Sequence, residues 1–133
     1  MPVNLEDLTA GVRTSWLKLS GPLDGVEVLV QYASPVEGEK FRRRMRSFGI
    51  MRDVKNGTEE IAEGRTRDYL VQFCQTYVKD WKGVTTKESG EPAPYSAEKL
   101  ADVMGAVGSA FREIHAAIGR EESFFGNGGD GST

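Results

Sequence analysis

The stretch that decides the fold, residues 67–84, reads RDYLVQFCQTYVKDWKGV. Its large apolar side chains recur at steps of three and one, which places them on one face of an α-helix. They are Leu70, Phe73, Cys74, Tyr77, Val78 and Trp81. Charged and amide side chains occupy the other face, as in a helix with one buried side. Because Gly83 is free to take a left-handed conformation after a helix, the pattern predicts a helix from Arg67 that ends near Trp81.

Two runs upstream of this helix have the composition of β-strands. Residues 14–20 and 26–32 are rich in β-branched, aromatic and leucine residues, and a loop with glycine and proline at residues 21–25 separates them. This arrangement predicts a β-hairpin. Alternate positions of the second run share one apolar face, formed by Val26, Val28, Val30 and Tyr32. A lone hairpin is marginal in water, so this face must pack on helices or on a partner.

A second helix is predicted directly after the hairpin. Ser34 can cap it, Pro35 suits its first turn, and the apolar stripe consists of Phe41, Met45 and Phe48.

The polar segment of residues 53–64 follows this helix. It carries the turn signal Asn56-Gly57, and Thr58 is a candidate N-cap. We expect either a mobile connector here or a weak helix that merges into the helix at Arg67.

A loop is predicted at residues 85–94, with a short hairpin around residues 88–91 as an alternative within it. Ser96 then caps a helix whose apolar stripe is Leu100, Val103, Met104, Val107, Phe111, Ile114 and Ile118. Gly105 and Gly108 interrupt the stripe, and each costs about 1 kcal/mol against alanine in a helix interior. The glycines allow a kinked helix, two helices that meet near Gly105, or a close approach between helices.

The resulting fold class is α+β and mostly helical, with an N-terminal β-hairpin followed by three to four helices. A chain of 133 residues fits one domain. We assign residues 1–122 to a single small domain and residues 123–133 to a flexible tail, of which the glycine-rich part is expected to be disordered.

The residues offer little for catalysis or for metal binding. His115 is the only histidine and Cys74 the only cysteine. We interpret Cys74 as a buried small apolar residue and His115 as a structural or exposed histidine. We therefore predict no catalytic, cofactor-binding or metal site, and a protein that is not an enzyme. No apolar run approaches the ~18 residues of a membrane-spanning helix, and the first ten residues lack the order of a signal peptide. We expect a cytoplasmic protein without membrane contacts.

The densest positive charge lies at Lys40, Arg42, Arg43, Arg44 and Arg46. A solvated helix face is the favoured interpretation, and a contact to an anion or an acidic protein is the sharper one. The net charge is −3, so no general basic field exists to attract nucleic acid. Trp81 also has two interpretations, a core residue and a partner contact, and its register with Tyr77 favours the core.

Three segments in order carry a family resemblance: VLVQYASP at residues 28–35, YVKDWKGV at residues 77–84 and PYSAEKL at residues 94–100. This combination resembles the tail assembly chaperones of long-tailed bacteriophages. The resemblance implies a non-enzymatic protein of the host cytoplasm that binds the tape measure protein and keeps its apolar helices soluble. It also implies help in recruiting the tail tube protein.

We expect partner contacts at Val28, Val30, Tyr32, Arg42, Arg43, Arg46, Trp81, Phe124 and Phe125. Several apolar faces in so small a chain also predict self-association, or a monomer that assembles on its client. The alternative function is a small nucleic-acid-binding regulator that uses the basic run Lys40–Arg46. Binding to arbitrary DNA with a steep salt dependence would favour it.

Overall fold

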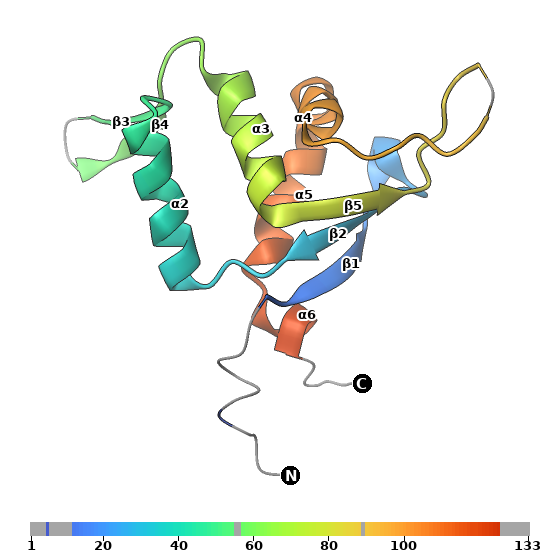
Figure 1. Cartoon of the computed structure of the whole chain (residues 1–133), viewed down its shortest axis with the longest axis horizontal. Coiled ribbons are helices and arrows are strands. Elements are labelled where there is room, and N and C mark those ends of the chain that lie inside the picture. The colour runs from blue at the N-terminus through green and yellow to red at the C-terminus, as the bar shows by residue number, and fades with distance from the viewer. Residues whose placement is uncertain (1–4, 6–11, 55–56, 89, 126–133) are drawn as a thin grey trace.

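The computed structural model describes residues 5, 12–54, 57–88 and 90–125. Figure 1 shows a small sheet on one side of the fold and a helix with a second, shorter hairpin on the other. Three further helices pack in the middle of the molecule: α3 (Thr66–Tyr77), α4 (Ala97–Ala106) and α5 (Gly108–Ile118). The α+β class is confirmed.

The sheet has the antiparallel order β1-β2-β5, with β1 at Thr14–Lys18, β2 at Glu27–Gln31 and β5 at Val78–Lys82. The predicted hairpin is confirmed, and a 3-10 turn, η1 (Gly21–Leu23), lies in its loop. Val28 and Val30 are fully buried under the helices, as the alternation in this strand indicated. The loop is tied to α5, because the backbone N–H and hydroxyl of Ser20 both donate to Glu113.

The predicted helix end near Trp81 is wrong, because α3 ends at Tyr77 and the chain continues directly into β5. The side chains of Val78 and Trp81 are nevertheless buried, as the helical pattern required. The pairing explains this, since Leu29 pairs with Asp80 and Val30 with Val78. The intervening Lys79 is therefore an extra residue in a β-bulge. Because of the bulge, Val78 and Trp81 lie on the same face of the sheet although they are three positions apart. This is also the spacing of residues on one face of a helix.

Gly83 has the left-handed conformation expected of it, with φ at +87°, but it follows a strand and not a helix. A Cβ atom here would clash with the carbonyl oxygen of Gly25 in the hairpin loop. The position thus needs glycine for two reasons: its backbone has a positive φ, and the hairpin loop at Gly25 of the same chain approaches it closely.

The connector or weak helix predicted for residues 53–64 is also wrong. The chain forms a short antiparallel hairpin of β3 (Met51–Asp53) and β4 (Glu59–Ile61). Thr58 is no N-cap, because it directly precedes a strand, and Gly57 has a positive φ of 73°. Asn56 lies outside the described residues. The strands are too short and too polar to show the alternation that identifies a strand from sequence.

The helix α2 (Pro35–Ser47) begins as predicted, and the Ser34 hydroxyl accepts a hydrogen bond from the Glu37 backbone N–H at 3.2 Å. Phe41 and Met45 are buried. Phe48 is not, since 49% of it is exposed. It lies just beyond the last turn, where the chain leaves the helix toward β3, so the stripe loses its register with the core.

The second half of the chain follows the sequence pattern closely. Ser96 caps α4 through a hydrogen bond from the Lys99 backbone N–H, and the loop before it is drawn together by a bridge between Thr85 and Pro92. Of the three alternatives at the glycines, the structure shows two helices, with the break at Val107.

A short helix, α6 (Glu121–Phe125), follows α5. The flexible tail predicted from residue 123 thus includes three residues that belong to α6, and Phe124 packs in the core. Phe124 is buried because its apolar ring packs against the ring of Tyr32. Residues 126–133 lie outside the described part of the chain.

Candidate protein-binding groove

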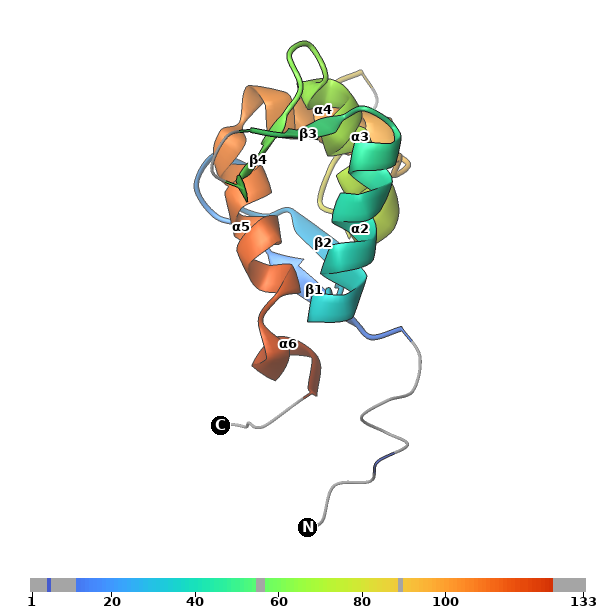
Figure 2. The same cartoon turned by 90° about the vertical axis from the view of Figure 1, so that its left-hand side faces the viewer.

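A groove lies between α2 and α5, with α3 as its floor. It has a volume of about 630 Å³ and is open to solvent on one side. Figure 2 shows the molecule from the direction in which α2 and α5 lie on opposite sides of the view. Its lining comes from five segments and includes Tyr32, Gly38, Phe41, Arg42, Met51, Tyr69, Phe73, Tyr77, His115 and Glu121.

Aromatic rings form the floor and one wall of the groove. Tyr69, Phe73 and Tyr77 lie one turn apart along α3, and their rings follow one another at 6.4 and 5.2 Å. Phe41 of α2 contacts all three rings. His115 of α5 stacks on Phe73 at 6.1 Å with an interplanar angle of 29°. Phe41, Phe73 and Tyr77 are themselves nearly fully buried, so the exposed part of this aromatic lining comes from Tyr32, Tyr69 and His115. Aromatic side chains of this kind are enriched at protein interfaces.

Gly38 forms part of the wall on the α2 side. It lies inside the helix with an ordinary helical φ, where glycine is less favourable than alanine by about 1 kcal/mol. A Cβ atom here would meet only the end of the Arg42 side chain, at 3.7 Å. The fold therefore does not require glycine at this position. What the missing side chain does provide is width in the groove.

Two tyrosine hydroxyls in the groove have no hydrogen-bond partner within the described part of the chain. Tyr77 is only 3% exposed, and Tyr69 is half-buried. Among the residues that the structure describes, none donates a hydrogen bond to either hydroxyl or accepts one from it. Burial raises the pKa of the Tyr77 hydroxyl to about 12, and the neighbouring Tyr69 adds to the shift. Buried polar groups without a partner are rare in native proteins, and each one needs an explanation.

The lower end of the groove is closed by the segment around Tyr32. The backbone N–H of Ala33 donates to the carbonyl of Ile118 at 2.8 Å, which joins β2 to the end of α5. The Tyr32 ring contacts Phe124 and Phe125, each at 5.3 Å. Burial raises the pKa of the Tyr32 hydroxyl, and the Glu121 carboxylate raises it further, so an acidic side chain lies at this end.

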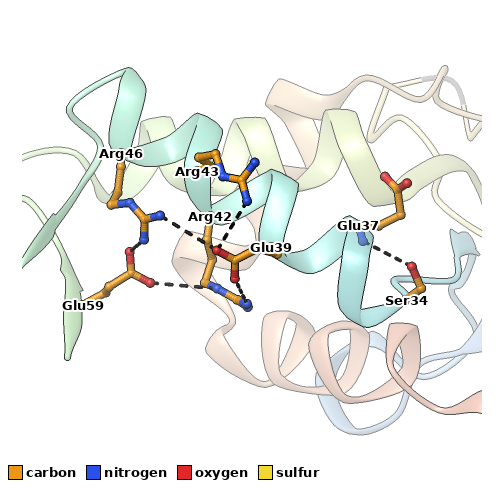
Figure 3. Close-up of polar contacts among 7 residues, drawn as sticks. All are labelled: Ser34, Glu37, Glu39, Arg42, Arg43, Arg46 and Glu59. Atoms are coloured by element: carbon orange, nitrogen blue, oxygen red, sulfur yellow. Dashed lines mark hydrogen bonds and ion pairs between the residues drawn. The ribbon is translucent and has the colours of Figure 1, made fainter. Parts of the chain in front are cut away.

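The basic run on α2 is largely paired within the protein, as Figure 3 shows. Arg42 donates to Glu39 at 2.7 Å, Arg43 lies 4.0 Å from the same carboxylate, and Arg46 binds Glu59 of β4. These guanidinium groups hold the pKa of the Glu39 carboxyl below its usual range, with the hydrogen bond from Arg42 as the main cause.

The remaining two cations of the run also have partners. Lys40 lies 3.6 Å from Glu37, and Arg44 donates to the Thr76 hydroxyl at 2.8 Å. The run is thus a helix face laced with ion pairs and hydrogen bonds, in line with the favoured interpretation of a solvated face.

The predicted partner residues are distributed over three places. Tyr32 and Arg42 line the groove, and Phe125 lies half-buried beside Tyr32. Arg43 and Arg46 lie on the paired face of α2. The other four, Val28, Val30, Trp81 and Phe124, are buried in the core and present no surface in this structure. For Trp81 the core interpretation is confirmed, and its indole N–H donates to the Ala93 carbonyl at 2.8 Å.

Cys74 and His115, the two residues considered for catalysis or metal binding, both lie against core or aromatic side chains. Cys74 is fully buried, with its sulfur 3.6 Å from that of Met104, and burial raises the pKa of its thiol to about 12. This confirms Cys74 as a small core residue. His115 is exposed and stacked on aromatic rings. Within the described ranges, no group of three acidic, histidine or cysteine side chains could hold a metal ion. No described helix is long and apolar enough to cross a membrane.

The sequence predicts Phe73 and Tyr77 on the buried face of the helix, which is confirmed, but it does not assign Gly38, Tyr69 or His115 to a groove. The available signal was the aromatic spacing at residues 69, 73 and 77, one turn apart on a helix. Comparison with known proteins does not assign the groove, because no family model, curated protein or solved structure matches this chain.

Proposed function

We propose that this protein is a non-enzymatic tail assembly chaperone of a long-tailed bacteriophage, which holds apolar helices of the tape measure protein in the α2–α5 groove. The proposal includes recruitment of the tail tube protein and work in the host cytoplasm. It rests on the resemblance of residues 28–35, 77–84 and 94–100 to that family. The observation that carries it is the open aromatic groove between two helices, because amphipathic helices are commonly bound by such grooves.

The nucleic-acid alternative has less support. A protein that binds DNA through its phosphates needs cations that are free to replace counterions. The chain has a net charge of −3, and the carboxylates of Glu37, Glu39 and Glu59 lie among the cations of the basic run, so the run is not part of a broad basic surface.

The test of the chaperone proposal blocks the groove without removing any core contact. Gly38→Leu adds a side chain on the wall of the groove at a position where the Cβ atom has room. Because leucine is a better helix former than glycine, the variant should be as stable as the wild type or more stable. Gly105→Leu in α4 is the matched control, since a Cβ atom there meets nothing within 4 Å and Gly105 is not part of the groove.

The measurement is the soluble fraction of an apolar tape measure fragment co-expressed with each full-length variant, followed by light scattering of the purified mixtures. We expect wild type and Gly105→Leu to hold the fragment in solution and Gly38→Leu to lose most of this activity. Light scattering also reports whether the protein self-associates alone or only on its client. A monomeric wild type that ignores the fragment at tens of micromolar would contradict the proposal.

A further inference from the structure

The unpaired hydroxyl of Tyr77 points to the chemistry of the helix that the groove accepts. The hydroxyl lies on the floor of an aromatic groove, is shielded from solvent and has no hydrogen-bond partner among the described residues. Tyr69, eight residues or about two helical turns before Tyr77 along α3, carries a second hydroxyl without a hydrogen-bond partner among the described residues. Phenylalanine would supply the same ring at both positions without the unpaired polar group.

A fully apolar helix is a poor occupant for such a floor. Docking would remove the remaining water from both hydroxyls and leave them unpaired, which costs binding free energy. A helix with a hydrogen-bonding side chain at the right place would instead satisfy them. Sites built around a polar group discriminate strongly against ligands that lack its partner.

We propose that the groove selects amphipathic helices that carry one hydrogen-bonding side chain, such as asparagine, glutamine, serine or threonine, within their apolar stripe. This side chain pairs with the Tyr77 hydroxyl, and Tyr69 supports it. The inference rests on the proposed function and names the chemistry of its client. Tyr77 is thus a specificity-determining residue of the groove.

The charges at the lips of the groove complement one orientation of such a helix. On the α2 side, Arg42 is the cation of the basic run that lines the groove. The opposite end carries Glu121, and α6 has acidic side chains at Glu121 and Glu122 in its first turn and no basic one in its last. A client with an acidic residue on the flank beside Arg42 and a basic residue near Glu121 matches both charges, and these contacts would set its direction.

The test uses a series of designed amphipathic helices with a leucine stripe, an acidic flank and a basic end. Each peptide replaces one stripe leucine by asparagine, and the parent peptide has leucine throughout. Affinity for the full-length protein is measured by calorimetry. We expect one asparagine position to bind wild type about fivefold more tightly than its neighbours in the series, the size of one net hydrogen bond.

The Tyr77→Phe variant provides the decisive comparison. It keeps the ring and removes the unpaired hydroxyl, so its Tm should stay the same or rise by about 3 °C, while the advantage of the favoured asparagine peptide disappears. Tyr69→Phe should reduce that advantage in part. Tyr95→Phe is the matched control, because this hydroxyl lies outside the groove and is paired with backbone carbonyls. It should lower the Tm and leave the peptide preference unchanged.

The outcomes separate the two proposals. If the peptides and the tape measure fragment all fail to bind wild type, the proposed function falls with the inference. If the peptides bind but no asparagine position is preferred, or the preference survives in Tyr77→Phe, only the inference is overturned.

Discussion

On the side of α3 that faces α4 and β5, the polar groups of the buried aromatic residues are paired. The Tyr95 hydroxyl lies 3.2 and 3.4 Å from the carbonyls of Val78 and Cys74, and the Trp81 indole donates to Ala93. On the side that faces α2, the hydroxyls of Tyr69 and Tyr77 have no such partners among the described residues. Both sides are aromatic and both are largely buried.

The difference separates structural packing from binding. A paired polar group in a core stabilises one arrangement of the chain, and the Tyr95 hydroxyl does so where α3 ends and β5 begins. An unpaired buried polar group lowers the stability of the free protein, and it can contribute favourably only when a bound partner supplies its hydrogen bond. We therefore interpret the α4 side as the stable part of the fold and the α2 side as the part that recognises a client.

The largest expected effect comes from breaking the paired side. Trp81→Ala removes a ring that is 8% exposed, contacts Tyr95 at 5.4 Å and anchors the loop at Ala93. We expect the free energy of unfolding to fall by about 3–5 kcal/mol, as for other large-to-alanine changes in cores. Urea denaturation followed by circular dichroism measures it.

Trp81→Phe is the control, because it keeps most of the packing and removes only the indole N–H. Its loss should be clearly smaller than that of Trp81→Ala. An equal or smaller loss for the alanine variant would contradict the assignment of Trp81 to the core.

Alkaline pH gives a second, smaller effect on the same side. Burial raises the pKa of the Cys74 thiol from 9.0 to about 12, so the folded protein holds this proton more tightly than the unfolded chain does. The stability from the protonated thiol is complete below pH 9 and is lost as the pH rises toward 12. Each pH unit in this window costs up to about 1.4 kcal/mol per group.

Melting temperatures between pH 8 and pH 11 test this expectation. Cys74→Ala should start about 1–2 kcal/mol less stable at neutral pH, but it should lose stability less steeply above pH 9. Burial also raises the pKa of the Tyr77 hydroxyl to about 12, so part of the alkaline loss should remain in the variant. Parallel curves for wild type and Cys74→Ala would show that the thiol is not shielded from water.

Much of the fold follows from local patterns, and the errors have a common cause. The hairpin, the caps at Ser34 and Ser96 and the two helices around Val107 depend on turn residues, caps and periodicity within one segment. The end of α3 is not predicted correctly, because the β-bulge forms only by pairing with β2, which is far away in sequence. The residues that the bulge brings to the buried face keep a helical spacing. The hairpin of β3 and β4 is too short to have a period of its own.

The groove was harder to predict than the fold. Aromatic residues spaced one turn apart along α3 look the same in sequence whether they are covered by a second helix or left at the floor of a groove. Only the distance between α2 and α5 decides this, and it is set by contacts among several elements. Two of the residues expected to contact a partner, Tyr32 and Arg42, line the groove.

The smallest expected effect concerns Phe48, which the sequence pattern assigned to the core stripe of α2. Because about half of this residue is exposed, Phe48→Ser should change the free energy of unfolding by no more than about 0.5–1 kcal/mol. Phe48 is also outside the α2–α5 groove, so client binding should equal that of the wild type. Chemical denaturation and the fragment-solubility measurement check the two parts. A loss of several kcal/mol would restore the predicted stripe, whereas a loss of client binding with normal stability would move the recognition surface from the groove to the end of α2.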